Sequence, residues 1–292
     1  MNTPDVPHEP PRRCGGAGVV FEPLTNALVD SAWALSTQAG WEQTREDWRR
    51  LARLTGGGVW VWTDEGEVRA SFSLVGYGSS LAWIGMILVD REYRGRGLGR
   101  ESFAAALDAA NARSFDALGL DATDQGAPIY RKFGFAEVCP ITRWRGNPRP
   151  TKPTNAQKVI LDQGIAEWDR EVCGLDRSAL LADLAASGAQ FLSVEGGNGR
   201  RAYGVLRPSR TAWFLGPVAA STPADFHDIV RGASEHCGGG ELICDVLHEA
   251  ASPCLIEAGL SPQRHLSRMV WPQARSVLCG PSVWCGAGFE IG

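Results

Sequence analysis

A short segment rich in glycine and arginine, Arg94-Gly95-Arg96-Gly97-Leu98-Gly99, is the first place where this sequence could do chemistry. An apolar run at 83–89 precedes it, and an amphipathic helical pattern follows it. Glycines have no Cβ, so successive backbone N–H groups can converge on one point, and a helix start adds unpaired N–H groups and a positive dipole. The segment therefore predicts an anion-binding loop between a buried strand and a helix, with Arg100 adding further positive charge.

Two better-known glycine motifs are excluded by spacing. Counted from Gly95, the sixth residue is Arg100, and counted from Gly97 it is Ser102, so the dinucleotide fingerprint G-x-G-x-x-G fails. A phosphate-binding P-loop would end in Gly-Lys-Ser or Gly-Lys-Thr, which is absent here. An ordinary strand-to-helix turn remains the alternative for the loop by itself.

The motif R-x-x-G-x-G at 94–99, followed by Y-x-x-x-G-F at 130–135, resembles the acyl-CoA-binding core of the GNAT N-acetyltransferases. The blocks 39–44, 81–86 and 120–123 resemble one bacterial branch of that family, in which two GNAT-like domains follow one another. The resemblance covers nearly the whole chain and is strongest between residues 39 and 135. Glu42 departs from it, because that branch commonly has asparagine there.

This resemblance implies an acetyl-CoA-dependent N-acetyltransferase that acetylates the amine of a small molecule or amino acid, directly within a ternary complex and without a metal. A non-catalytic acyl-CoA-binding sensor, with the second domain as its output module, is the alternative. A structural protein that reuses the fold is a third hypothesis. The resemblance implies that coenzyme A lies along the strand at 83–89 and on the glycine loop, with its pyrophosphate on the loop. The coenzyme-binding residues are then Ile87, Leu88, Val89, Arg94, Gly95, Arg96, Gly97, Leu98, Gly99, Arg100 and Tyr130.

Three side chains are the main candidates for proton transfer. Tyr130 matches the family's tyrosine and would protonate the departing thiolate, since a phenol titrates near 10. A core tyrosine on an amphipathic helix is its alternative. Glu42 and Asp121 are the carboxylates best placed by resemblance to accept the amine's proton, with Asp124 as a third, although a chain of water molecules would serve as well. The acceptor pocket is expected to be walled by core-like residues, namely Trp41, Glu42, Trp83 and Met86.

Sequence periodicity gives an order of elements that could hold these residues together. Short apolar or alternating runs indicate strands, and apolar residues three or four apart indicate helices. Thr44 is expected to cap the second helix. The order predicts an α/β (α+β) fold with a mixed, mostly antiparallel sheet flanked by helices. The expected elements are strand 18–22, helices 24–38 and 44–54, strands 58–63, 67–76 and 83–89, a helix after the loop, strand 116–122, helix 127–133 and strand 135–144.

The second half of the chain partly repeats this pattern. We expect a disordered tail at 1–13, a first GNAT domain at 14–145, a proline-rich linker at 146–156 and a second GNAT-like domain at 157–292. The run 213–218 corresponds to 83–85, but no glycine loop follows it, and Leu255 stands at the position of Tyr130. The second domain is therefore expected to lack a coenzyme site and to contribute walls to the acceptor pocket. Candidates for such contacts, or for the domain interface, are Asp176, Arg177 and Arg207.

Composition restricts the class of protein further. The chain has 292 residues and a formal net charge of −4, which gives no reason to expect binding to nucleic acid or to an anionic membrane. No apolar run is long enough to span a bilayer, and the first residues lack the pattern of a signal peptide, so a cytoplasmic protein is expected. None of the eight cysteines forms a Cys-x-x-Cys pair, which favours reduced thiols over disulfides or zinc. The expected partner is a small amine, and the expected state is a monomer or homodimer.

Overall fold

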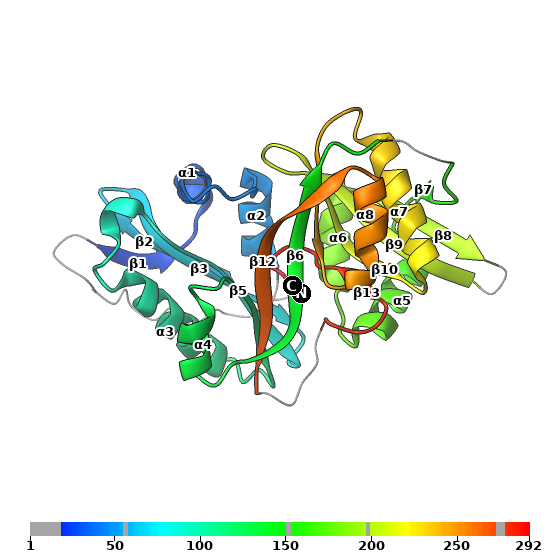
Figure 1. Cartoon of the computed structure of the whole chain (residues 1–292). Coiled ribbons are helices and arrows are strands. Elements are labelled where there is room, and N and C mark those ends of the chain that lie inside the picture. The colour runs from blue at the N-terminus through cyan, green and yellow to red at the C-terminus, as the bar shows by residue number, and fades with distance from the viewer. Residues whose placement is uncertain (1–18, 55–57, 150–152, 197–198, 273–277) are drawn as a thin grey trace.

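The computed structural model describes residues 19–54, 58–149, 153–196, 199–272 and 278–292. The N-terminal lobe comprises residues 19–146 and begins with a strand, two helices and three more strands (Figure 1). A long helix follows the glycine loop, as its apolar periodicity predicts. The elements of this lobe are β1 Val20–Pro23, η1 Asn26–Leu28, α1 Val29–Gln38, α2 Arg45–Arg53, β2 Gly58–Asp64, β3 Glu67–Tyr77, β4 Leu81–Val89, η2 Arg91–Tyr93, α3 Leu98–Asn111, β5 Leu118–Ala122, α4 Ala127–Lys132 and β6 Ala136–Gly146.

The C-terminal lobe comprises residues 157–292 and repeats this order in outline, with two helices before its first long strands. Its last elements differ, because a long strand and a very short strand close the chain. The elements are β7 Gln157–Val159, α5 Gln163–Cys173, α6 Ser178–Ala186, β8 Gln190–Gly196, β9 Gly199–Pro208, β10 Trp213–Ala220, α7 Pro223–His236, β11 Leu242–Val246, η3 Glu249–Ala251, α8 Ser252–Glu257, β12 Leu260–Trp271 and β13 Val283–Cys285.

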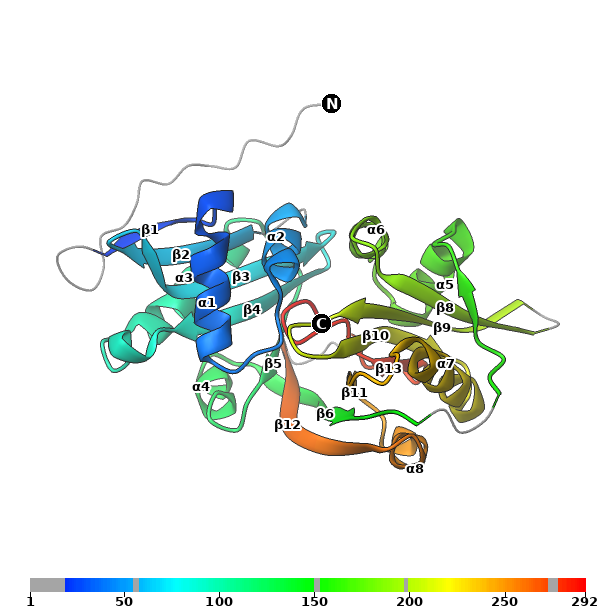
Figure 2. The same cartoon turned by 90° about the horizontal axis from the view of Figure 1, so that it is seen from above.

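One sheet runs through both lobes. In the described part of the chain it has 13 strands, in the order β1-β2-β3-β4-β5-β12-β6-β11-β13-β10-β9-β8-β7. The two lobes exchange strands at its centre: β12 pairs antiparallel with β5 of the N-terminal lobe, and β6 pairs antiparallel with β11 of the C-terminal lobe. β6 and β12 also pair with each other, and they run side by side between the lobes (Figures 1 and 2). The boundary at 146–156 therefore divides the sequence but not the sheet.

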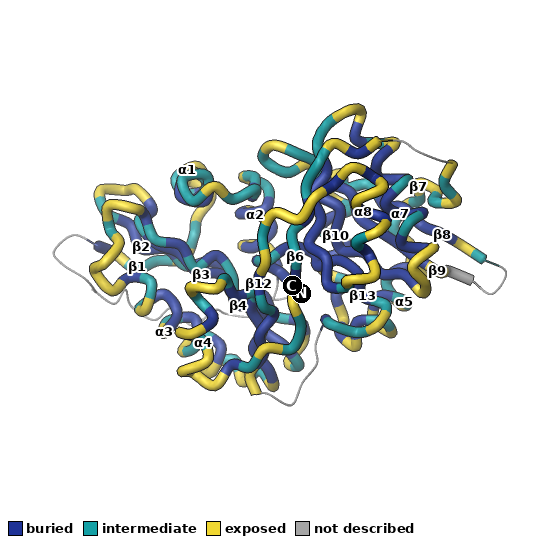
Figure 3. The backbone as a smooth tube through the Cα atoms, viewed as in Figure 1, coloured by how far each residue is buried: buried dark blue, intermediate teal, exposed yellow. Residues whose placement is uncertain are grey.

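Helices cover both faces of the sheet, as the expected α+β fold requires. In the N-terminal lobe, α1 and α2 pack on one face around Trp48 and Leu51, and α3 packs on the other around Phe103 (Figure 2). Strands β4, β10 and β11 are largely buried, whereas the exchanged strands β6 and β12 and the outer surfaces of the helices are partly exposed (Figure 3). Thr44 caps α2 as expected: its hydroxyl accepts from the Asp47 N–H at 3.2 Å, and the Asp47 carboxylate accepts from the Thr44 N–H at 2.8 Å.

The expectation of reduced thiols is wrong at one pair of cysteines. Cys139 on β6 and Cys279 form a disulfide, with Cα atoms 6.6 Å apart. Cys279 belongs to the C-terminal segment, residues 278–292. They lie 140 residues apart in the sequence, so no local spacing could indicate the bond. The strand exchange brings the C-terminal segment back against β6, which explains the contact. Five other cysteines of the described chain are free and buried.

Among the described residues, no helix is both long enough and apolar enough to cross a bilayer.

Candidate active site

A gap between two parallel strands forms the centre of the site. β4 and β5 pair only near their starts, where Ala82 lies opposite Leu118 and Trp83 opposite Gly119. Beyond this point the strands diverge, because β4 bulges: its register against β3 shifts, and Met86 adopts a left-handed φ of 49°. The Ser71 hydroxyl donates to the Met86 carbonyl at 2.7 Å and fixes the bulge.

The glycine loop lies just beyond the end of β4. Gly97 is the N-cap of α3 with a φ of 91°, a left-handed conformation that favours glycine. A Cβ at Gly97 or Gly95 would meet no atom within 4 Å, so both face open space. None of the N–H groups at 95, 96 and 97 bonds to a carbonyl of the described residues. These groups are therefore available as donors, and the anion-binding role expected for the loop stays a prediction.

Three arginines surround the loop. Arg94, Arg96 and Arg100 are exposed, and within the described ranges none has a carboxylate at ion-pair distance. Arg94 donates to the Val89 carbonyl at 3.3 Å, and Arg96 stacks on the Tyr93 ring at 4.6 Å. Their charges are therefore held near the loop without being neutralised. This arrangement fits a pyrophosphate, which needs converging N–H donors and compensating positive charge.

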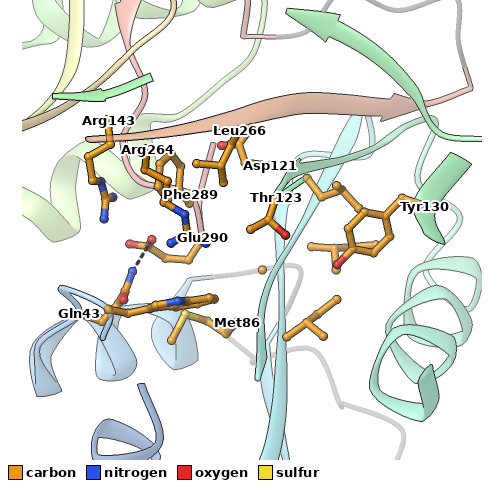
Figure 4. Close-up of a pocket in the computed structure, with 15 residues that line it drawn as sticks. Gln43, Met86, Asp121, Thr123, Tyr130, Arg143, Arg264, Leu266, Phe289 and Glu290 are labelled. Carbon is orange, nitrogen blue, oxygen red and sulfur yellow. Dashed lines mark hydrogen bonds between the residues drawn. The ribbon is translucent and has the colours of Figure 1, made fainter. Parts of the chain in front are cut away.

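A cavity of about 130 Å³ opens from the gap between β4 and β5. It extends from Tyr130 on one side to Arg143 on the other (Figure 4). Its walls come from β4, β5 and α4 of the N-terminal lobe, from β6 and β12, and from the C-terminal segment. The lining residues are Trp41, Gln43, Ile84, Gly85, Met86, Ile87, Leu120, Asp121, Thr123, Tyr130, Arg143, Arg264, Leu266, Phe289 and Glu290.

Tyr130 lies at the end of this cavity nearest α3, the helix that starts at the glycine loop. Its ring packs against Phe103 with centroids 4.8 Å apart, which fixes its orientation on the short helix α4. Burial raises the pKa of the Tyr130 hydroxyl above its ordinary value of 10, so the group keeps its proton at neutral pH. A protonated phenol beside the gap can act as a proton donor.

Glu42 is placed differently from what a proton acceptor requires. It does not line the main cavity but a smaller one beside it. Its carboxylate accepts from Arg145 at 2.9 Å and from the Thr211 hydroxyl at 2.8 Å. Burial raises its pKa, but these hydrogen bonds outweigh burial and leave the pKa of Glu42 below its ordinary value. The side chain joins the two lobes as a stable anion.

Asp121 and Trp83 are also held by structural contacts. Asp121 lines the cavity, but both of its oxygens accept hydrogen bonds from Arg268, at 2.9 and 3.0 Å. Burial raises the pKa of Asp121, and the paired guanidinium opposes that shift. Trp83 is fully buried, does not line the cavity, and donates its indole N–H to the Phe289 carbonyl at 2.9 Å. Of the four expected pocket residues, the structure therefore places Trp41 and Met86 in the cavity wall.

The cavity contains one carboxylate that the sequence did not single out, Glu290. It is 4 % exposed, and its Oε2 accepts from the Gln43 Nε2 at 2.9 Å (Figure 4). Burial raises the pKa of Glu290, and the nearby Asp47 carboxylate adds to the shift. Glu290 belongs to no motif and lies 247 residues from Gln43. The one local signal is Gly85, where a Cβ would come within 2.8 Å of the Glu290 backbone. Gly85 lies beside the bulge of β4, and its lack of a side chain admits this segment.

The corresponding gap in the C-terminal lobe is filled by the chain itself. β13 pairs with β10 and β11, the strands that correspond to β4 and β5. At Gly216 a Cβ would come within 2.2 Å of the Gly286 carbonyl oxygen, so no ligand strand could pair there. Thr222 and Pro223 begin α7, whose first turn is capped by the Thr222 hydroxyl. In the described part of this lobe, the gap beside β10 is therefore closed and the helix that follows β10 begins with a capped first turn.

The other polar residues expected at the pocket or the domain interface lie outside the main cavity. Arg207 donates to the carbonyls of Gly216 and Ala287 and lies 3.8 Å from Asp47, so it contacts both lobes. Arg177 is buried against Asp169 at 2.7 Å within the C-terminal lobe. Asp176 pairs with Arg170 on the surface at 3.3 Å. Only Arg207 of these three belongs to the interface.

Comparisons with known proteins agree with this geometry. Residues 25–135 match the model of the acetyltransferase (GNAT) family, and residues 165–276 match a second acetyltransferase (GNAT) domain model. The chain is 26 % identical to holothin acyltransferase of Pseudoalteromonas sp. (strain SANK 73390) over 201 residues, 67 % of each chain. It is 26 % identical over 239 residues to the uncharacterized N-acetyltransferase YitH of Bacillus subtilis (strain 168), covering 79 % of this chain and 84 % of YitH. In fold it is similar to the crystal structure of a Pyrococcus horikoshii protein, with a TM-score of 0.81 and 20 % identity over 98 % of this chain and 100 % of that one.

Proposed function

Because the chain belongs to the GNAT family of acetyltransferases, with one GNAT domain in each half, we propose that it transfers the acetyl group of acetyl-CoA to the amine of a small molecule. Members of this family are acyltransferases that use an acyl-CoA co-substrate and acylate amines. The observation that carries the proposal is the joint placement of three features: an open gap beside the bulge of β4, the unpaired N–H groups of the glycine loop just beyond β4, and Tyr130 in the wall of the cavity at this gap.

Each feature has a role in the proposed reaction. Acetyl-CoA supplies an activated thioester when it is bound. The loop at 94–100 holds the pyrophosphate through free N–H groups and Arg94, Arg96 and Arg100. The edge of β4 at Ile87 to Val89 pairs with the amide-bearing arm of the coenzyme and offers N–H groups to the thioester oxygen. Tyr130 gives its proton to the departing thiolate.

The N-terminal lobe provides one coenzyme site, and the C-terminal lobe provides none. The glycine loop and the gap occur together only in the first lobe of the described chain, while β13 fills the gap of the second. We therefore propose direct transfer in a ternary complex at a single site per chain. Neither Glu42 nor Asp121 is free to accept the amine's proton, since guanidinium groups hold both carboxylates.

The proposal is tested by thiol release from acetyl-CoA with a panel of small amines, together with calorimetric titration of coenzyme A. We expect one coenzyme bound per chain and amine-dependent release of free thiol. Binding of coenzyme A without thiol release from any amine would instead support the sensor hypothesis. A stoichiometry near two would contradict the single site, and an absence of binding would contradict both.

A further inference from the structure

The C-terminal segment connects the filled gap of the second lobe to the open cavity of the first. After β13, the Gly286 N–H donates to the Asp245 carbonyl at 2.9 Å, and Arg207 donates to the Ala287 carbonyl at 2.6 Å. The next residues are held by the N-terminal lobe: Trp83 donates to the Phe289 carbonyl at 2.9 Å, and Tyr77 donates to the Ile291 carbonyl. Contacts from both sides therefore fix the position of residue 290.

The end of the cavity farthest from Tyr130 offers a carboxylate to a ligand. Glu290 is a buried carboxylate at this end, next to the bulge of β4 (Figure 4). Gln43 is 6 % exposed and uses its amide nitrogen to hold Glu290, so its Oε1 faces away from that bond. This Oε1 is buried and has no hydrogen-bond partner among the described residues, so Gln43 acts here only by holding Glu290 in place. A ligand ammonium at this end of the cavity would give the Glu290 carboxylate a charge-assisted hydrogen bond.

The same end of the cavity also carries a guanidinium that forms no ion pair with any residue the structure describes. Arg264 on β12 lies opposite Arg143 of β6 in the strand register, and both line the cavity. Asp245 holds Arg143 through two hydrogen bonds of 2.7 Å. Within the described ranges, no carboxylate lies at ion-pair distance from Arg264. Burial and the charge of Arg143 lower the pKa of Arg264, and the Asp245 carboxylate opposes this shift without reversing it.

From these contacts we infer that the acceptor is an amino acid, whose amine binds Glu290 and whose carboxylate binds Arg264. This inference rests on the proposed acetyl transfer and adds the class of its acceptor. Figure 4 shows Arg264 and Glu290 on the same side of the cavity, so a molecule with both charges close together fits them. The planar guanidinium of Arg264 can bind a carboxylate with two hydrogen bonds.

Glu290 then serves as the proton acceptor that Glu42 and Asp121 do not provide. The acceptor enters as an ammonium, and Glu290 takes one proton from it, which frees the nitrogen lone pair. The nitrogen forms the new C–N bond, the C–S bond breaks, and Tyr130 protonates the thiolate. The extra proton on the new amide nitrogen leaves through solvent and restores the Tyr130 hydroxyl, while Glu290 returns its proton to water. The products are an N-acetyl amino acid, coenzyme A as its thiol, and one proton.

The charged groups around Glu290 decide how this step depends on pH. Asp47 on α2 opposes ionisation of Glu290, and Arg207 on β9 favours it. The charge of Glu290 also contributes to raising the pKa of Arg143 on β6 and of Tyr77 on β3. Because burial raises the pKa of Glu290, kcat/KM should rise with pH through a pKa above the ordinary range of a glutamate. In Glu290→Gln this rise should disappear, and kcat/KM should fall by about 10²-fold or more.

Binding tests the acceptor class without the coenzyme. The probes are the proteinogenic amino acids and three amines that lack only the α-carboxylate of leucine, phenylalanine and lysine, namely isopentylamine, phenethylamine and cadaverine. Binding to the full chain is measured by saturation-transfer NMR and calorimetry, and turnover by thiol release from acetyl-CoA. We expect at least one amino acid to bind, and the free amines to bind at least tenfold more weakly than their parent amino acids. If no amino acid binds, or if the free amines bind as well, the inference is wrong.

Arg264→Gln provides the decisive comparison. We expect Arg264→Gln to reduce the affinity for amino acids at least tenfold and to leave the affinity for free amines unchanged. The discrimination between amino acids and free amines should therefore disappear. Arg170→Gln is the matched control, because it removes the same charge from an exposed surface pair and should retain the discrimination. Discrimination that survives in Arg264→Gln would overturn the assignment. Titration of coenzyme A in the same variants separates this result from a failure of the proposed acetyl transfer, since loss of the coenzyme site would abolish that binding.

Discussion

Asp121 on β5 and Arg268 on β12 form a buried ion pair with two hydrogen bonds, of 2.9 and 3.0 Å, although they lie 147 residues apart in the sequence. Neither side chain is exposed to solvent. Arg268 also donates to the Leu278 carbonyl at 2.9 Å and lies over the Trp83 ring. The pair therefore joins the first lobe's sheet to the strand that the second half contributes.

Breaking this pair should destabilise the whole chain. Asp121→Asn leaves the Arg268 charge buried without compensation, which costs about 3–5 kcal/mol in comparable cases. Unfolding in urea, followed by tryptophan fluorescence, measures the loss. Glu137→Gln is the control, because its pair with Arg131 is exposed and should change stability by less than about 1 kcal/mol. If Asp121→Asn is as stable as this control, the pair is not a structural link.

Gly97→Asp should weaken coenzyme A binding by at least tenfold, equivalent to about 1.4 kcal/mol. The new carboxylate would stand where the pyrophosphate is expected, and the left-handed φ of 91° adds backbone strain. Gly188→Asp controls for strain, since Gly188 has a φ of 85°, faces open space and lies in the other lobe. Calorimetric titration of both variants should show a loss only in Gly97→Asp. Equal affinities would place the coenzyme elsewhere.

Tyr130→Phe should lower turnover by about 10²-fold while coenzyme A affinity changes little, because only the hydroxyl is removed. Burial raises the pKa of Tyr130, so the wild-type enzyme should show no loss of kcat from ionisation of this residue up to about pH 9. The measurement is kcat between pH 6 and 9 under conditions where chemistry limits the rate. Full turnover of the variant would rule out Tyr130 as the proton donor.

Glu290→Gln should lose activity, but its stability relative to the wild type should increase as pH rises. A carboxyl group whose pKa is raised by folding contributes stability that is complete below its unfolded pKa, near 4.3. That contribution is lost as pH rises through the folded pKa, when the buried group must ionise. The glutamine variant has no such loss, so its unfolding free energy relative to wild type should increase from pH 5 to pH 8. A difference independent of pH would contradict the raised pKa.

The parts of the site that depend on local sequence could be predicted, and the parts made by distant contacts could not. The glycine loop could be predicted because a few neighbouring residues define it. Tyr130 lies on a helix that follows the loop in the sequence. Glu290 reaches the cavity only because the C-terminal segment passes from one lobe to the other. Asp121 was expected to be available as a base, but Arg268, on a strand from the second half, forms an ion pair with its carboxylate.

The fold shows the same division. The strands and helices of the first half lie within a few residues of their expected bounds, since their periodicity is local. The internal repeat indicated a second domain, and its missing loop indicated that it lacks a coenzyme site. The exchange of β6 and β12 had no such signal, because a strand's apolar pattern does not specify which neighbour it pairs with. The disulfide between Cys139 and Cys279 follows from that exchange and was therefore missed.

The exchange of β6 and β12 also bears on how such a chain can evolve. In a tandem duplication whose halves remain independent, the copy that loses its ligand site can be deleted without harm to the other. Here deletion of the second half would remove β12 from its place beside β5, and with it Arg268 and Glu290. Selection for the folding of the first half therefore also acts on the second, because β12 is part of the first lobe's sheet.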